Sequence, residues 1–278
     1  MLIQRIITAL VLLPIVLAAL FLLEPDGFAV FAGVVVALAA WEWARLAGLH
    51  RQVSRVLYAL VVVAIVATIS LAPEISRSFL LYAALAWWVA SLFLVISFPS
   101  SSAFWSSTGV RIIIGIYILV PFWVAIVFMR SADIVVYPGL SPLWLIFYTL
   151  FIVFAADTGA YFAGKTLGKS KLAPKVSPGK SWAGFWGGLI SACLFALAAC
   201  VQLDVPLSFY VQLVILTAIT SVFSVVGDLT ESMFKRQAGI KDSSQLLPGH
   251  GGVMDRIDSL VAAFPVMTSL LLIFGWIQ

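Results

Sequence analysis

The sequence predicts an all-α integral membrane protein with about nine transmembrane helices. The first observation is composition: 63% of the 278 residues are hydrophobic and 10% are charged, too few charges for a water-soluble fold of this length. The second is length, because the apolar residues form runs of about 20, which a helix needs to cross a bilayer. The third is an asymmetry of basic residues between the loops on the two sides, a pattern that sets orientation in a membrane.

Nine apolar segments are long enough to be spans. They are residues 5–23, 27–47, 54–72, 78–98, 110–129, 142–163, 182–203, 207–227 and 259–277. The first is interpreted as an anchor and not as a cleaved signal peptide, because its apolar run from Ile6 to Leu23 exceeds the usual length and lacks a clear small-x-small cleavage site. No internal repeat or soluble domain is evident, so we expect one polytopic domain, residues 1–278.

The positive-inside rule places the N-terminus in the cytoplasm. In this orientation only Arg77 and Arg130 of the sixteen Lys and Arg residues lie outside, and the other fourteen lie in the cytoplasm. Acidic residues such as Glu74 and Asp133 fall on the outer side. The prediction therefore puts the loops 164–181 and 229–258 at the cytoplasmic membrane interface.

The segment 232–258 is polar where nearly everything else is apolar. Its basic residues include Lys235, Arg236 and Lys241. A Pro-Gly-His-Gly-Gly turn at 248–252 precedes two carboxylates, Asp255 and Asp258, which share one face about 5–6 Å apart if the chain is helical after the turn. Such a pair suits hard divalent cations, and the glycines allow backbone N–H groups to approach an anion closely. The segment therefore predicts a site for phosphate and metal.

The spacing within this segment follows a longer pattern: Ser-x-hydrophobic-Lys-Arg, four residues, Lys-Asp, a turn ending in His-Gly-Gly, then hydrophobic-x-Asp-Arg-hydrophobic-Asp. The residues on the pattern are Ser232, Lys235, Arg236, Lys241, Asp242, His250, Gly251, Gly252, Asp255, Arg256 and Asp258. In this pattern the segment resembles the phosphatidate cytidylyltransferases, also called CDP-diacylglycerol synthases. The match covers about a tenth of the chain.

The resemblance implies an enzyme that transfers the cytidylyl group of CTP to phosphatidate, giving CDP-diacylglycerol and pyrophosphate for phospholipid synthesis. The nucleophile is a phosphate monoester, whose second pKa of about 6 leaves it ionised without a general base. The difficulty is repulsion between anions, which Mg²⁺, Lys and Arg relieve. The implied cofactor is Mg²⁺, with a second cation left open. The implied partners are CTP, phosphatidate and the lipid bilayer. No nucleic-acid partner is expected, and a homodimer is left open.

The resemblance further implies a bacterial inner-membrane protein with cytoplasmic catalytic loops. Its N-terminal spans would occupy about 1–130, and its catalytic helices and loops about 142–278. The predicted catalytic residues are Asp228, Lys235, Arg236, Lys241, Asp242, His250, Asp255, Arg256 and Asp258. For His250, a structural role in the turn is as well supported as a catalytic one.

A second polar region begins at Asp157, near the cytoplasmic end of the sixth predicted span, where a carboxylate needs a partner. A loop with five lysines follows, and its glycines and prolines predict a shaped loop without a long helix. Composition alone leaves a lipid-facing basic loop and a triphosphate clamp equally open. Asp-Thr-Gly-Ala-Tyr and Ser-Pro-Gly-Lys-Ser here are also similar to an upstream region of the same family. The predicted substrate-binding residues are Asp157, Lys165, Ser177, Lys180, Ser232, Gly249, Gly251 and Gly252.

Carboxylates elsewhere add to the predicted metal site. Asp228 and Glu231 end the eighth predicted span, where a salt-bridged helix end is the simpler interpretation. The expected approach of the C-terminal carboxylates favours a metal site instead, formed by Asp228, Asp255 and Asp258. Glu42, in the second span, is interpreted equally well as a functional carboxylate or as an interfacial partner of Arg45 or Arg111.

Two alternatives to a phosphatidate cytidylyltransferase fit the sequence less well. A transporter or ion channel also uses intramembrane carboxylates, but its binding sites lie near the bilayer midplane, whereas these charges cluster at the predicted cytoplasmic ends. A CDP-alcohol phosphotransferase is less similar, because the Asp-Gly, Ala-Arg, Gly, Asp, Asp order of that family is absent. A transporter also gives no reason for the phosphate-type turns beside these charges.

Overall fold

The computed structural model describes residues 2–136, 141–204 and 206–278. Within these ranges six side chains are not placed, those of Leu2, Ile3, Arg5, Ile6, Ala9 and Glu74. Arg5 and Glu74 were counted in the predicted orientation, so these two side chains lie outside the described part of the molecule.

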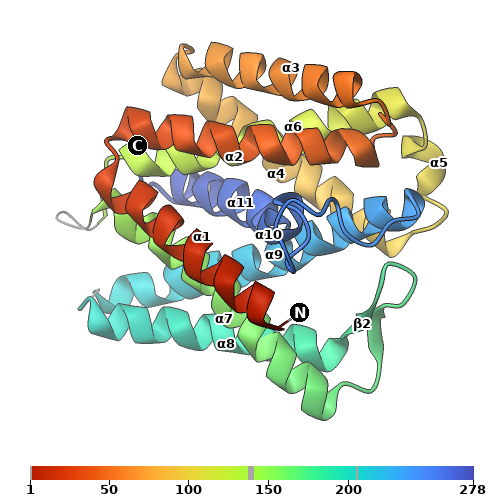
Figure 1. Cartoon of the computed structure of the whole chain (residues 1–278). Helices are drawn as coiled ribbons and strands as arrows, with labels where there is room; N and C mark the ends of the chain where they lie inside the picture. Colours follow the sequence, from red (N-terminus) through yellow and green to blue (C-terminus); the bar gives the residue numbers. More distant parts are fainter. Residues whose placement is uncertain (1, 137–140, 205) are drawn as a thin grey trace.

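The described chain is almost entirely helical (Figure 1). The first helices are α1 (Leu2–Leu22), α2 (Pro25–Leu46), α3 (Gln52–Ser70), α4 (Glu74–Ile96), α5 (Ser102–Trp105) and α6 (Thr108–Ser131). The later elements are α7 (Pro142–Leu167), β1 (Lys171–Ala173), β2 (Ser177–Ser181), α8 (Trp182–Gln202), the 3-10 helix η1 (Leu207–Phe209), α9 (Tyr210–Gln237), α10 (Met254–Ile257) and α11 (Leu260–Ile273).

Eight helical segments of the described chain are long and apolar enough to cross a membrane. They correspond to the second through ninth predicted spans, and the last of them joins α10 to α11. Helix α1 occupies the position of the first predicted span, but its apolar part among residues with placed side chains is only Leu10–Leu22. The chain is thus a multi-pass membrane protein, and a ninth span remains a prediction.

Helix α11 lies inside the bundle, against α4, α6, α7 and α9. In its span, Met254–Ile273, 72% of the most apolar stretch is buried, compared with 17% for the peripheral α3. Helix α2 packs between α3 and α6, and α7 packs along α8, as Figure 1 shows at opposite sides of the bundle. Three aromatic rings, Trp43, Trp105 and Phe234, join α2, α5 and α9 with centroid distances of 4.9 and 4.5 Å around Phe234.

The prediction of an all-α chain is wrong at one place, the connection between α7 and α8. Strands β1 and β2 pair there as an antiparallel hairpin, with Lys171 opposite Ser181 and Ala173 opposite Ser177. Pro174 and Pro178 cannot continue a helix, which explains why the lysine-rich segment becomes extended. Ser181 ends the hairpin and caps α8, because its Oγ accepts a hydrogen bond of 3.1 Å from the Gly184 N–H. The predicted shaped loop without a long helix is confirmed.

Candidate active site

Helix α9 extends past the predicted end at residue 227 and carries a polar row on its last turns. Asp228, Glu231, Ser232 and Lys235 are spaced by three or four residues, so they share one face. Ser232 Oγ donates to Asp228 Oδ1 over 3.2 Å, and Lys235 Nζ donates to Glu231 Oε2 over 2.7 Å. The helix therefore delivers two carboxylates and an ammonium group to one region, beside the start of α11.

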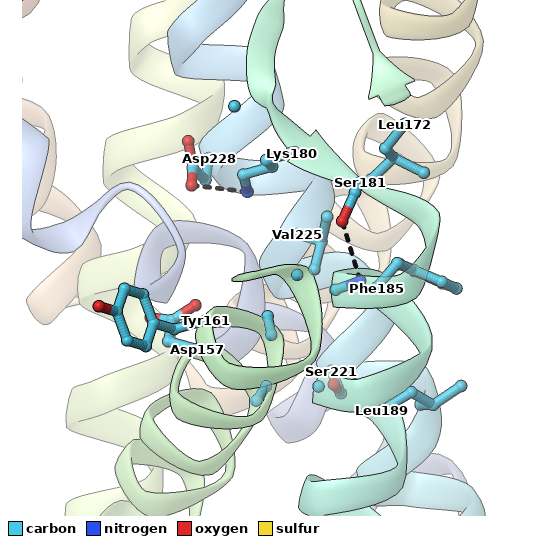
Figure 2. A pocket seen from close by; sticks show the side chains of 16 residues that line it. Asp157, Tyr161, Leu172, Lys180, Ser181, Phe185, Leu189, Ser221, Val225 and Asp228 are labelled. Carbon is cyan, nitrogen blue, oxygen red and sulfur yellow. Dashed lines mark hydrogen bonds and ion pairs between the residues drawn. The ribbon is translucent and has the colours of Figure 1, made fainter. Parts of the chain in front are cut away.

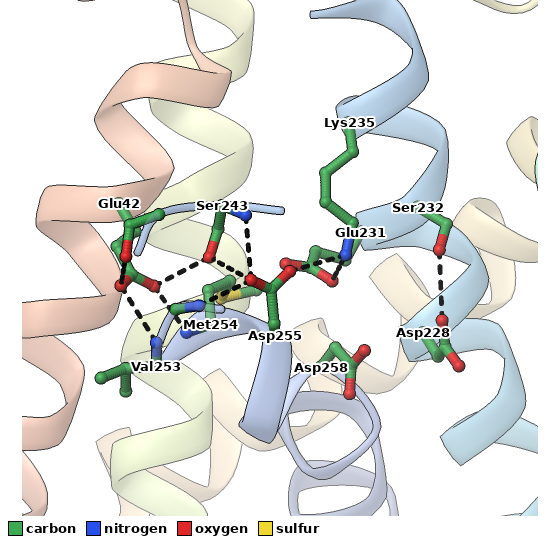
Figure 3. A network of polar contacts seen from close by, with 12 residues as sticks. Glu42, Asp228, Glu231, Ser232, Lys235, Ser243, Val253, Met254, Asp255 and Asp258 are labelled. Carbon is green, nitrogen blue, oxygen red and sulfur yellow. Dashed lines mark hydrogen bonds and ion pairs between the residues drawn. The ribbon is translucent and has the colours of Figure 1, made fainter. Parts of the chain in front are cut away.

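A glycine brings Asp228 close to Asp258. A Cβ added at Gly227 would lie 2.5 Å from the backbone oxygen of Asp258, a distance that no side chain tolerates. Helix α9 can therefore lie directly against the backbone at the start of α11, and Asp258 is found opposite Asp228 in Figure 3. The expected approach of these two carboxylates is found in the structure.

Asp255 lies apart from this pair, between Lys235 of α9 and the segment that begins at Ser243 (Figure 3). Its Oδ1 accepts from Lys235 Nζ over 2.8 Å. Its Oδ2 accepts from Ser243 N, Ser243 Oγ and Gly252 N over 2.8–2.9 Å. Residues 253–259 have helical backbone angles or helical assignments, as expected after the glycines, but the hydrogen-bonding capacity of Asp255 is already largely used.

The predicted metal trio is not gathered as a single cluster. Across the described residues, no three His, Cys, Asp or Glu side chains converge to hold one ion. The reason is the orientation of Asp255, which is bonded to Lys235 and Ser243. Glu231, which the prediction left without a role, has its Oε1 buried with no donor in the described part of the chain. The exposed fraction of Glu231 is only 1%.

Helices α7, α8 and α9 enclose a cavity of about 250 Å³ (Figure 2). Asp157 and Tyr161 line it from α7, Lys180 from the end of β2 and Asp228 from α9. Lys180 Nζ forms an ion pair of 2.6 Å with Asp228 Oδ2, and both side chains are about a quarter exposed. The structure thus joins the two polar regions that lie some 70 residues apart in the sequence.

Other predicted site residues surround this centre. Arg236 Nε donates to the backbone oxygen of Val176 over 3.1 Å and so ties the hairpin to α9. Ser177 is half-buried at the start of β2. Lys165 lies on the last turn of α7 with its Nζ 5.7 Å from the centroid of the Tyr161 ring. The exposed predicted residues are Asp157, Lys165, Arg236, Lys241, Asp242, Gly249 and Arg256.

The Pro-Gly-His-Gly-Gly turn has the backbone that its glycines predict. Gly249 and Gly251 adopt positive φ angles of 74° and 83°, which favour glycine. The His250 N–H donates to the Leu247 oxygen over 2.9 Å, while its Nδ1 is buried with no hydrogen-bond partner in the described residues. Both interpretations of His250, structural and catalytic, therefore stay open.

Sequence reasoning missed Ser243 and Ser244, which connect the turn to helix α2. Ser243 Oγ lies 3.0 Å from Glu42 Oε2, and Ser244 Oγ donates to Glu42 Oε1 over 2.6 Å. The expected partners of Glu42 act elsewhere: Arg45 donates to the Ser243 oxygen, and Arg111 donates to backbone oxygens including that of Leu46. Two consecutive hydroxyl residues, separated by three residues from the glycine turn at 248–252, were the available signal.

Comparison with known proteins identifies the family of the chain. The family model described as "Cytidylyltransferase family" matches residues 3–274. A protein of Pseudomonas aeruginosa named phosphatidate cytidylyltransferase is 48% identical over 276 residues, which cover 99% of each chain. A protein of Haemophilus influenzae with the same name is 43% identical, covering 95% of this chain and 96% of its own. One from Bacillus subtilis, also so named, is 46% identical over 47% of this chain. The chain therefore belongs to the cytidylyltransferase family.

Proposed function

We propose that this chain transfers the cytidylyl group of CTP to phosphatidate, giving CDP-diacylglycerol and pyrophosphate. The observation that carries the proposal is the full-length similarity to two proteins named phosphatidate cytidylyltransferase. The site supports it, because lysines and carboxylates from three segments gather beside a cavity, as transfer between phosphates requires. A transporter is not favoured, since it would not account for this similarity.

The lysines are proposed to neutralise the phosphates. Lys180 borders the cavity and is held by Asp228, from which it can turn to a phosphate oxygen when substrate enters. Lys235 is held between Glu231 and Asp255, so its ammonium group keeps a fixed position and a fixed charge. Arg236, Lys241 and Arg256 are proposed to add positive charge around the phosphates. No general base is needed, because the attacking lipid phosphate is already ionised.

Two carboxylates of the site are suited to hold Mg²⁺. Mg²⁺ commonly uses one or two carboxylates plus substrate phosphates and water, and Asp228 and Asp258 form such a pair on facing helices. The buried Oε1 of Glu231 has no hydrogen-bond donor among the described residues and so remains a free acceptor. When bound, Mg²⁺ would offset the charge on the phosphate oxygens. Asp255 as a third ligand remains a prediction, since it would have to give up Lys235 or Ser243.

The surroundings of the site complete the proposal. We propose that the end of the bundle with Lys180, Lys235 and the 243–252 segment faces the cytoplasm of a bacterial cell, where CTP is available. The supporting observation is the fourteen-to-two distribution of basic residues, of which Arg77 and Arg130 are the two outside. The whole chain would act as one polytopic unit in the inner membrane, and a homodimer remains a prediction.

A direct assay tests the proposed activity. Purified protein in detergent, supplied with CTP, phosphatidate and Mg²⁺, should release CDP-diacylglycerol and pyrophosphate in equal amounts. Replacing CTP by ATP tests the base, and adding a chelator tests the metal. Folded protein that forms neither product under these conditions would refute the proposal.

A further inference from the structure

We propose that Glu42, on helix α2, is a positioning residue that holds the 243–254 segment and, through Ser243, the carboxylate of Asp255. The inference rests on the proposed function, because it gives Glu42 a role in the same cytidylyl transfer. It also extends that function to the N-terminal half of the chain, where the sequence left Glu42 open as either a functional carboxylate or an interfacial partner of Arg45 or Arg111.

The first observation is the complete burial of the Glu42 carboxylate. The side chain is fully buried, with 0% exposed, in a helix that is long and apolar enough to span a membrane. A charge in this position is costly unless its surroundings compensate it. No ion pair of the described residues includes Glu42, although Arg55 interacts with it over a longer distance. Its hydrogen bonds come from neutral donors.

The second observation is the source of those donors. Oε1 accepts from Ser244 Oγ over 2.6 Å and from the Val253 N–H over 3.0 Å. Oε2 accepts from Ser243 Oγ over 3.0 Å and from the Met254 N–H over 2.7 Å. Each oxygen thus joins one residue before the glycine turn to one residue after it, which fixes the two ends of the turn relative to each other (Figure 3).

The third observation is the link to Asp255. Ser243 Oγ lies 3.0 Å from Glu42 Oε2 and 2.9 Å from Asp255 Oδ2. A serine hydroxyl has one hydrogen, so it can donate to only one of these two carboxylates at a time. The position of Glu42 therefore influences the hydrogen bonding of Asp255, whose other oxygen holds Lys235.

The fourth observation is the close packing at Gly252. A Cβ at this residue would lie 2.1 Å from Ser243 Oγ and 2.5 Å from Glu42 Oε2. The backbone, the hydroxyl and the carboxylate are therefore in direct contact, and the turn cannot shift without breaking a hydrogen bond. Glu42 does not line the cavity beside Lys180, so it positions the machinery without touching the substrate there.

The test begins with Glu42→Gln. Glutamine has nearly the same size, but its amide nitrogen would face either the Val253 or the Met254 N–H, so one donor meets another donor. We expect kcat to fall about 10- to 100-fold, as for other residues that orient a site, while KM for CTP and phosphatidate changes by no more than about threefold. Glu42→Asp keeps the charge and should retain an intermediate kcat.

Two matched comparisons separate positioning from general stability. Ser269→Ala removes a fully buried hydroxyl that lies 3.0 Å from the Leu81 oxygen and 2.7 Å from the Pro265 oxygen, far from the turn. It should lower Tm without lowering kcat per folded molecule. Ser243→Ala should reduce kcat more than Ser244→Ala, because only Ser243 also contacts Asp255. The double variant Glu42→Gln, Ser243→Ala should lose less activity than the product of the two single losses, since both substitutions break the connection from Glu42 to Asp255.

The proposal is overturned if Glu42→Gln keeps the wild-type kcat per folded molecule, or if its loss is fully additive with that of Ser243→Ala. If Glu42→Gln does not fold, equal effects of Ser243→Ala and Ser244→Ala overturn it instead. Hydrogen exchange supplies a readout independent of activity: Glu42→Gln should speed exchange in peptides from 243–256 and not in peptides from 171–181. Wild-type protein without transferase activity would refute the proposed function, while unchanged exchange in Glu42→Gln would refute the positioning role.

Discussion

The two lysines at the centre of the site differ in how tightly they are held. Lys235 is buried and bonded to two carboxylates, Glu231 and Asp255, at 2.7 and 2.8 Å. Lys180 has one carboxylate partner and a side chain that is 26% exposed. An exposed ion pair contributes little to stability and exchanges partners readily, whereas a buried pair keeps its geometry. Lys180 is thus suited to follow a moving phosphate, and Lys235 to hold a fixed charge.

Substitution of Lys180 tests the first of these roles. Lys180→Ala should lower kcat/KM about 100-fold, the effect of removing one preorganised charge from a phosphate site. Steady-state kinetics on correctly inserted protein measures the change. Lys169→Ala is the matched control, because this lysine is exposed in the same connection and lies outside the cavity lining. Equal activities in the two variants would show that Lys180 has no special role and that the connection is a basic, lipid-facing loop.

The facing carboxylates can be tested in the same way. Asp228→Asn and Asp258→Asn keep size but remove the charge that a cation requires, so each should lose about 100-fold or more in activity. A higher Mg²⁺ concentration for half-maximal rate should accompany any residual activity. Asp26→Asn, an exposed position in the first turn of α2, is the control. Near-wild-type activity of Asp258→Asn at ordinary Mg²⁺ would place the metal elsewhere.

At the scale of elements, glycines determine how closely α7 and α8 approach. A Cβ at Gly188 would lie 2.6 Å from the Ala156 backbone oxygen, and one at Gly159 would lie 2.1 Å from Ser191 Oγ. Close approach of small residues is a main source of helix association in a bilayer, where hydrophobic burial between helices gives little. Helices α7 and α8 therefore form one closely packed side of the cavity, and Asp157 of α7 lines it together with Lys180.

This packing predicts the effect of one methyl group. Gly188→Ala must push α7 and α8 apart, so it should destabilise the protein by about 1–3 kcal/mol, the usual cost of overpacking. Gly109→Ala is the matched control at the start of α6, where nothing lies within 4 Å of the added Cβ. Thermal unfolding in detergent compares the two. An unchanged Tm in Gly188→Ala would show that this contact is not tight in solution.

Elements were predictable from sequence where hydrophobicity alone determines them. Eight of the nine expected spans correspond to long apolar helices, because length and apolar content decide that outcome. Helix ends were less predictable: α9 continues to Gln237, with Glu231 and Lys235 paired within the helix and Asp228 paired with Lys180 of β2. The β1–β2 hairpin was not foreseen, since strands of three and five residues are too short to give a periodic signal.

The site was predictable in part for a related reason. The spacing of Asp255 and Asp258 and the nearby glycines can be read from the sequence. They correctly predicted the helical backbone of the two aspartates and the turn before them. The direction of Asp255 was not, because it depends on Ser243 and on Glu42, which is 213 positions away from it in the chain. Contacts between distant segments follow from packing, which no local pattern encodes.

At the scale of the whole molecule, the remaining prediction concerns the two sides of the membrane. A single cysteine at Ser170, in the connection between α7 and β1, should resist an impermeant thiol reagent added to intact cells and react after lysis. A cysteine at Ser131, beside Arg130 at the end of α6, should react from outside. Cys193 and Cys200 must first be replaced. Labelling of the residue 170 variant in intact cells would reverse the proposed orientation.

The burial of α11 has a consequence for how the protein is made. This helix follows every other described helix in the sequence, yet it lies at the centre of the bundle and is the most enclosed of the eight candidate spans. The helices synthesised earlier must therefore enter the membrane before α11 is made. Until then, the groove between α4, α6 and α9 that α11 occupies is unfilled. Asp258 and the backbone partners of Glu42 arrive with this late segment, so a nascent chain should have no catalytic activity until biosynthesis has passed residue 273.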